Sequence, residues 1–159
     1  MRYDIQLPDN KSVKIRQMIL AHVRGAEIPS LSGADGSDVR VVRNALQTLR
    51  VVTARKISAA PSPKTGAMPE PPVMVDVADC GAAYRFLMPL LAATTGVWLL
   101  TGEPRLLQRP ILPLVETLRG VGADIERVGD GWLIHGKTLA EPPKRGETGM
   151  DGGHMANDP

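Results

Sequence analysis

The sequence predicts an α/β protein built from repeated units. Segments of alternating apolar residues, typical of strands, are interleaved with segments in which apolar residues recur every three or four positions, typical of helices. The same order of segments occurs twice, with a repeat of roughly 70 to 75 residues. Such a repeat favours stacked α/β units over a single doubly wound sheet. We therefore expect a partial domain over residues 1–139, with units at about 1–58 and 73–139.

The first unit is expected to open with a strand followed by a helix. The alternating stretch YDIQL predicts a short strand that ends before Pro8. Asn10 is a residue type favoured at N-caps, so a helix is expected from about Lys11 to Arg24, with Gly25 closing it. Its apolar stripe consists of Ile15, Met18, Ile19 and Val23.

The turn-rich stretch LSGADGSD separates this helix from a second one. Ser37 can cap a helix over residues 38–50, whose apolar face consists of Val39, Val42, Leu46 and Leu49. The stretch VVTARKI, residues 51–57, predicts a strand. Residues 59–72 contain five prolines and few large apolar groups, which is typical of a loop or mobile linker.

The second unit repeats the pattern of the first. The predicted order is strand 73–77, helix 81–95, strand 96–102, helix 109–122 and a strand hairpin over 124–136. Pro89 is expected to bend the first of these helices, and Pro110 suits the first turn of the second. Residues 140–159 carry almost no apolar content, so we expect a polar, disordered tail there.

Composition excludes several classes of protein. The formal net charge of +2 and the five aromatic residues in 159 argue against a nucleic-acid-binding surface. A single cysteine, Cys80, excludes an internal disulfide framework and agrees with a reducing compartment. No apolar run approaches the roughly 20 residues of a membrane helix. We therefore expect a soluble, cytoplasmic protein with no membrane partner.

Four basic residues lie at predicted helix starts: Lys11, Arg16, Arg85 and Arg109. Helix N-termini attract anions through free N–H groups and the helix dipole, so a cation placed there suggests an anionic ligand between the two. Arginine also offers a planar fork suited to phosphate or carboxylate. Gly81 would let a ligand approach the backbone closely. Solvated surface charges explain the same pattern, and the spacing alone does not decide between the two.

The remaining polar residues point less clearly to a site. Asp35 and Asp38 suit helix caps or a solvated loop better than an acidic pair. The three histidines, His22, His135 and His154, lack metal-ligand spacing. Cys80 precedes a helix start and is expected to be a small buried residue. We therefore expect no metal site among these residues.

Several motifs resemble the 5-enolpyruvylshikimate-3-phosphate synthase family from about Asp4 to Gly153. The stretch LPDNKSVKIRQMILAHV is similar to the family's opening Lys-Ser-x-x-x-Arg segment. The stretch VDVADCGAAYRFLMPLLAATTGVWLLTGEPRLLQRP matches a helix start Gly-x-x-x-Arg, a strand end Thr-Gly and a helix start Arg-Pro. Ser12 favours this family over the related UDP-N-acetylglucosamine enolpyruvyl transferases, which usually have Asn there.

The resemblance implies a fold, a reaction and a set of roles. The fold would be part of an inverse α/β barrel, with about two βαβαββ units. The reaction would transfer the enolpyruvyl group of phosphoenolpyruvate to shikimate 3-phosphate, a step of chorismate and aromatic amino acid biosynthesis that needs no cofactor. The implied roles are Lys11 touching both substrates, Ser12 and Arg16 holding shikimate 3-phosphate, Gly81 and Arg109 binding phosphoenolpyruvate, and Arg85 in support.

Departures from the family pattern qualify this expectation. The family has two domains of three units each, whereas about two units are predicted here, so we expect a truncated chain that is inactive alone and binds its substrates weakly or not at all. Met155, Ala156 and Asn157 replace two serines and a glutamine of a family motif, and Ala82 replaces a threonine. The alternative is a non-catalytic fragment or pseudoenzyme that binds a complementary chain, itself or a phosphorylated small molecule.

Overall fold

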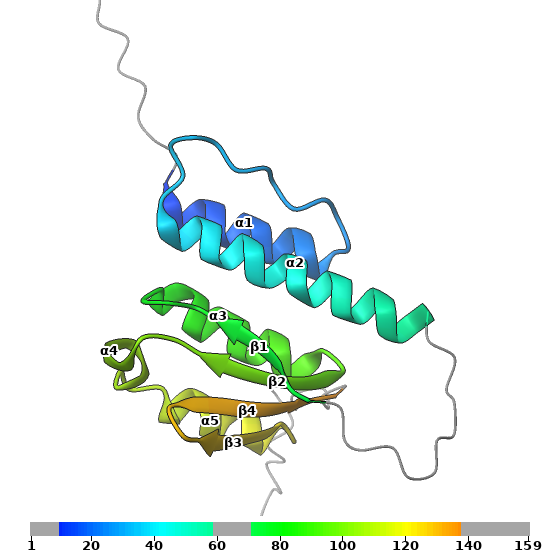
Figure 1. Cartoon of the computed structure of the whole chain (residues 1–159), viewed down its shortest axis with the longest axis vertical. Coiled ribbons are helices and arrows are strands. Elements are labelled where there is room, and N and C mark those ends of the chain that lie inside the picture. The colour runs from blue at the N-terminus through cyan, green and yellow to red at the C-terminus, as the bar shows by residue number, and fades with distance from the viewer. Residues whose placement is uncertain (1–9, 59–70, 138–159) are drawn as a thin grey trace, which may run out of the picture.

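The computed structural model describes residues 10–58 and 71–137 (Figure 1). The predicted first strand, most of the linker and the predicted tail, including the stretch at 155–157, lie outside these ranges. The helices and strands are α1 (Lys11–Val23), α2 (Ser37–Ser58), β1 (Val73–Asp76), α3 (Gly81–Ala93), β2 (Gly96–Thr101), α4 (Pro104–Leu107), α5 (Leu112–Gly120), β3 (Asp124–Val128) and β4 (Gly131–Gly136). The predicted α/β class is confirmed.

The second unit has the predicted order of strand, helix, strand, helix and hairpin. β1 and β2 run parallel and are joined by α3, as a parallel pair requires. β4 pairs antiparallel with both β2 and β3, which gives one sheet with the order β1-β2-β4-β3. One detail of the prediction is wrong. The helix expected from Arg109 begins at Leu112, so Pro113 and not Pro110 lies in its first turn, and the short helix α4 precedes it.

The strand predicted at residues 51–57 is also wrong, because these residues continue α2. Leu49 is buried, and Val52 packs partly buried against the same core, so the apolar face of the helix extends beyond the predicted end. The free energy gained by packing this helical face against the rest of the molecule is larger than the weak preference of valine and threonine for strands. Within residues 10–58 the structure therefore contains two helices and no strand.

The core is centred on α3, which contacts α1, α2 and α5 as well as β2 and β4. In Figure 1 the pair α1 and α2 lies above, and α3 and α5 lie behind the strands of the sheet, on the same face of it. Nearly half of α3 is buried, through Ala83, Tyr84, Leu87, Met88, Leu91 and Ala92. Strand residues facing α3, including Trp98, Leu100 and Ile134, are fully buried.

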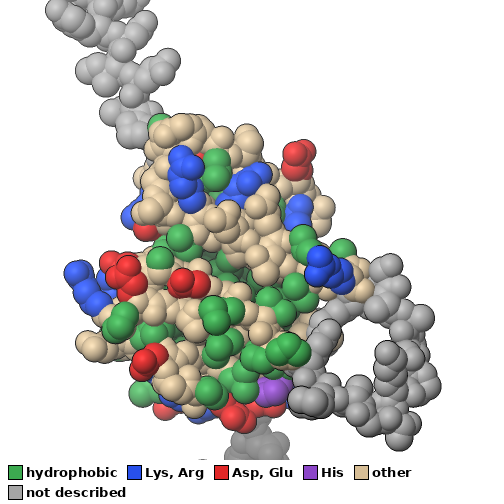
Figure 2. Space-filling model, in the orientation of Figure 1, with side chains coloured by type: hydrophobic (Ala, Val, Ile, Leu, Met, Phe, Trp, Pro, Cys, Tyr) green, Lys and Arg blue, Asp and Glu red, His purple; other side chains and the backbone are tan. Residues whose placement is uncertain are grey.

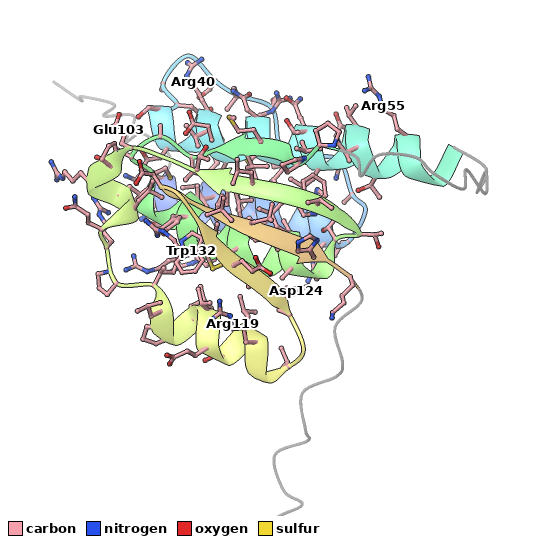
Figure 3. All side chains as sticks on the ribbon, turned by 60° about the horizontal axis from the view of Figure 1, so that its bottom comes forward. Arg40, Arg55, Glu103, Arg119, Asp124 and Trp132 are labelled. Carbon is pink, nitrogen blue, oxygen red and sulfur yellow. The ribbon has the colours of Figure 1, made fainter. Side chains whose placement is uncertain are left out.

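The opposite face of the sheet is open. Met74 on β1 and Val128 on β3 are exposed, and hydrophobic side chains gather over the strands in Figure 2. Burial therefore alternates along the strands, as in β2, where Trp98 and Leu100 are buried and their neighbours are partly exposed. Trp132 on β4 lies on the inner face, where its Nε1 donates to the Tyr84 hydroxyl at 2.7 Å (Figure 3).

Candidate functional site

The starts of α1, α2 and α3 meet at one end of the molecule. Lys11 Nζ on α1 lies 2.7 Å from Asp38 Oδ2 on α2, and Cys80 Sγ, before α3, lies 4.0 Å from Asp38 O. The three helices therefore run in the same direction, and their N-termini form one cluster. Because each N-terminus carries free N–H groups and a partial positive charge, this end of the molecule attracts anions.

Side chains cap the first and third of these helices. Asn10 Oδ1 accepts hydrogen bonds from the backbone N–H groups of Ser12 and Val13, at 3.0 and 3.3 Å, which confirms the predicted N-cap. Cys80 Sγ accepts from Ala83 N at 3.3 Å. Cys80 is buried, as predicted, and burial raises the pKa of its thiol. The cysteine is therefore a neutral structural cap.

Lys11 is the cation at the centre of this cluster. Its hydrogen bond with Asp38, and the charge of that carboxylate, raise the pKa of Lys11, so the ammonium stays charged at neutral pH. The Lys11 side chain is 59% exposed. An ion pair as exposed as this contributes little to stability, so an incoming anion can take over the Lys11 ammonium at low cost.

Ser12 and Arg16 lie one turn apart on α1 and are both exposed. Residues four apart on a helix share one face, so their side chains can reach the same ligand. Arg16 makes no hydrogen bond or ion pair within residues 10–58 and 71–137. Its guanidinium is therefore available to an anion, but no contact in the structure ties it to Lys11.

Gly81, Arg85 and Arg109 form a second group at the start of α3. A Cβ placed on Gly81 would lie 2.6 Å from Arg109 Nη1 and 3.9 Å from Arg85 Nη1. The sequence suggested that Gly81 leaves room for a ligand. In the structure the guanidinium of Arg109 occupies that room, and Arg109 Nη2 also lies 3.4 Å from Asp79 Oδ1. The glycine therefore allows an arginine to lie directly against the helix start.

The loop before α3 is held by the loop that follows β2. Glu103 N donates to Ala78 O at 2.9 Å, and Asp76 Oδ1 accepts from Ala78 N at 2.8 Å. Ala78 has a φ of 47°, a left-handed conformation that is unfavourable for a residue with a side chain. A Cβ on Gly102 would lie 2.8 Å from Ala78 O, so only glycine fits there. These contacts fix the start of α3.

A buried ion pair beside the cluster is the main feature that the sequence analysis missed. Lys14 Nζ lies 2.7 Å from Asp35 Oδ2, and the side chains are only 10% and 5% exposed. Ser32 N also donates to Asp35 Oδ2, at 2.5 Å, and both contacts hold the pKa of Asp35 below its ordinary value. The sequence does carry a signal for both ion pairs. Lys11 and Lys14 are three residues apart in α1, and Asp35 and Asp38 are likewise three residues apart.

The structure shows no metal centre among the residues that it describes. No group of three or more His, Cys, Asp or Glu side chains there is placed to hold a metal ion. His22 lies near the end of α1 and His135 in β4, while His154 is outside the described residues. Across the same residues, no helix is long and apolar enough to span a bilayer.

Comparisons with known proteins give one consistent result. The sequence profile described as EPSP synthase (3-phosphoshikimate 1-carboxyvinyltransferase) matches residues 1–134. Proteins named 3-phosphoshikimate 1-carboxyvinyltransferase are similar to the chain: one from Anaeromyxobacter sp. is 30% identical over 82% of this chain and 30% of its own length. The protein from Photobacterium damsela subsp. piscicida is 34% identical over 98% of this chain and 36% of its own length.

The chain spans about a third of the length of these relatives. Among solved structures, an EPSP synthase from Acinetobacter baumannii matches with a TM-score of 0.49 and 22% identity, covering 83% of this chain and 31% of that one.

Proposed function

Because the chain belongs to the EPSP synthase family, we propose that the cations at the starts of α1 and α3 bind shikimate 3-phosphate and phosphoenolpyruvate. In this proposal Lys11 contacts both ligands, and Ser12 and Arg16 hold the phosphate of shikimate 3-phosphate. Arg109, lying against Gly81, binds phosphoenolpyruvate, and Arg85 supports it. The observation that carries the proposal is that the starts of α1, α2 and α3 lie together. Lys11 and Arg109 are far apart in the sequence, and both lie at this cluster.

The chemistry of the site suits these ligands. Both are polyanions, and fixed guanidinium and ammonium groups can stabilise charge that develops as the enolpyruvyl group is transferred. Asp38 and Asp79 hold Lys11 and Arg109 in place until a ligand competes for them. This competition should make binding weak. The chain also spans only about a third of the length of its relatives, so we expect negligible turnover by these 159 residues alone. A cytoplasmic location belongs to the same proposal.

Calorimetric titration with shikimate 3-phosphate, alone and with phosphoenolpyruvate present, tests the proposal. We expect saturable heat from the unaltered chain and at least about tenfold weaker binding for the Lys11→Ala, Arg16→Ala double variant, since each lost charge-assisted contact contributes roughly 1.5–3 kcal/mol. Gly81→Ala is the sharper variant because it keeps every charge and only displaces the Arg109 guanidinium. It should weaken the response to phosphoenolpyruvate most.

Arg24→Ala is the matched control, since it removes one positive charge from the opposite end of α1. Its titration should equal that of the unaltered chain. Equal heat from the double variant, or no heat from the unaltered chain, would contradict the proposal. Release of phosphate from phosphoenolpyruvate, followed with both substrates present and at high protein concentration, tests the expected lack of turnover separately.

A second candidate function is the binding of a partner chain or a second copy through α1. Val13, Leu20 and Val23 are exposed on this helix, and Leu20 has half of its surface open to solvent. Apolar residues spaced along one exposed helix face are typical of a surface that another element covers. The spacing of the three residues is the observation that favours this candidate.

Sedimentation velocity over a range of concentrations measures self-association. We expect the unaltered chain to associate and Leu20→Gln to shift the distribution towards monomer. Val128→Gln, which removes an equally exposed valine from β3, should have no effect. A monomer at every concentration would rule out self-association through α1.

A further inference from the structure

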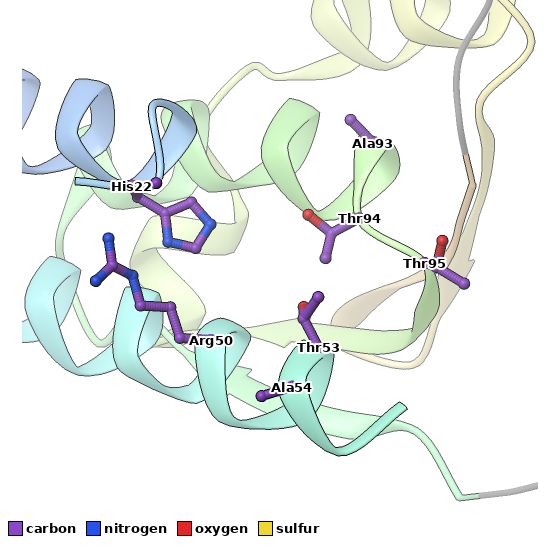
Figure 4. A pocket seen from close by; sticks show the side chains of 8 residues that line it. His22, Arg50, Thr53, Ala54, Ala93, Thr94 and Thr95 are labelled. Atoms are coloured by element: carbon purple, nitrogen blue, oxygen red, sulfur yellow. The ribbon is translucent and has the colours of Figure 1, made fainter. Parts of the chain in front are cut away.

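A large cavity that is widely open to solvent lies at the end of the helices opposite to the cluster of helix starts. Its volume is about 980 Å³, and its lining comes from the ends of α1 and α3 and from the second half of α2 (Figure 4). Lys11 and His22 are eleven residues apart on α1, which corresponds to about 16 Å along a helix. The cavity is therefore separate from the proposed substrate site.

Two nitrogen-bearing side chains, one from α1 and one from α2, lie together on one side of this cavity. The His22 ring on α1 lies beside the Arg50 guanidinium on α2 in Figure 4. Arg50 Nη2 donates to Ala26 O, which holds the guanidinium in place and leaves its other N–H groups unused in the described structure. No acidic residue is among the residues that line the cavity.

His22 carries an unsatisfied polar atom. Its Nδ1 is buried and has no hydrogen-bond partner among the described residues, which is uncommon for a buried polar atom. Burial, and then the charge of Arg50, lower the pKa of His22, so the ring is neutral at pH 7. The end of α3 presents only Ala93, which Thr94 and Thr95 follow, and none of these three adds a charged side chain. The lining therefore has one charged side chain, that of Arg50, beside the neutral ring of His22.

We propose that this cavity binds a small monocarboxylate with an apolar body. The carboxylate pairs with the free edge of the Arg50 guanidinium and meets the His22 ring, which can offer it an N–H group. The apolar body lies against Ala54, Ala93 and the methyl group of a lining threonine. Ligand pockets of this size commonly combine a mostly apolar lining with a few converging polar groups.

The helix directions make a polyanion a poor occupant. α1 and α3 point their C-terminal ends, which carry partial negative charge, at this cavity. Backbone groups that follow already satisfy several of the terminal carbonyls, as in Ala26 N to Ala21 O and Lys137 N to Ala92 O. The single positive charge of Arg50 neutralises the single negative charge of a carboxylate, whereas a phosphate with more negative charge is better stabilised at the N-terminal ends of the helices. The two ends of the same helices thus select different anions.

NMR titration with benzoate, following the histidine ring resonances at pH 7, tests this inference independently of the substrate site. We expect a saturable shift of the His22 resonances. Benzamide, which has the same shape without the charge, and inorganic phosphate should each bind at least about tenfold more weakly. Arg50→Gln should weaken benzoate binding by about tenfold or more, since the charged fork is lost.

Two further variants complete the design. Arg55→Gln is the matched control, because Arg55 is exposed on the same helix and points away from the body of the molecule (Figure 3). It should bind benzoate like the unaltered chain. Ala54→Leu should fill part of the cavity and weaken binding with all charges intact. Unchanged binding by Arg50→Gln or by Ala54→Leu, equal binding of benzamide, or no saturable His22 shift would overturn the inference. If Arg50→Gln fails to fold, the benzoate titration of Ala54→Leu alone tests the inference.

Discussion

Gly136→Ala is expected to lower the free energy of unfolding by about 3 kcal/mol or more, the upper range for overpacking a rigid core. A Cβ on Gly136 would overlap the carbonyl oxygens of Thr94 and Leu91, which are backbone atoms at the end of α3. Neither oxygen can move freely, because Trp98 Nε1 donates to Thr94 O at 2.8 Å and Thr94 N donates to Leu91 O at 3.1 Å. The end of β4 must therefore separate from α3, around which the core is built.

Urea denaturation followed by circular dichroism measures this loss. Gly120→Ala is the matched control, since Gly120 lies in the last turn of α5 and a Cβ there meets nothing within 4 Å. This control should be neutral or more stable by roughly 0.5–1 kcal/mol, the usual gain for replacing a helical glycine. A Gly136→Ala variant within about 0.5 kcal/mol of the unaltered chain would mean that β4 does not pack against α3 in this way.

The sequence predicted the second unit well because its signals were local. The apolar run of β2, the glycines at 129 and 131 between the hairpin strands and the helix start expected at Gly81 placed these elements to within a few residues. The error at residues 51–57 arose from tertiary context. Valine and threonine favour strands by themselves, but Leu49 and Val52 continue a face that packs on the core, and packing decided the outcome.

The sequence located two of the three helix starts in this cluster, while the binding roles of their residues stay a prediction. Helices begin at Lys11 and Gly81 as expected, because start signals lie in nearby residues, whereas Arg109 lies between α4 and α5 and not at a helix start. The partners of these groups depend on how distant segments pack. The contacts Lys11–Asp38 and Arg109–Asp79, and the placement of His22 beside Arg50, need the three parallel helices to be assembled first.

Asp35→Asn is expected to destabilise the protein roughly three times as much as Asp38→Asn, or more. Both substitutions remove a carboxylate paired with a lysine of α1 at 2.7 Å, and both keep the shape of the side chain. They differ in burial: Lys14 and Asp35 are almost completely enclosed, while Lys11 is largely exposed. Removing one partner of a buried pair leaves the other charge without that counter-charge in a poorly solvated place, whereas water replaces the partner of an exposed one.

The dependence on pH separates this effect from a simple loss of packing. Lys14, and then the N–H of Ser32, hold the pKa of Asp35 below its ordinary value in the folded state. A lowered carboxylate pKa stabilises the fold at every pH above the unfolded value of about 4, and this contribution is lost as the pH falls through the lower, folded value. Denaturation of the unaltered chain and of Asp35→Asn from pH 7 to pH 2 should show a constant difference above about pH 4 that shrinks below it. A difference that stays constant down to pH 2 would mean that Asp35 stabilises the fold by its shape and hydrogen bonds alone, without its charge.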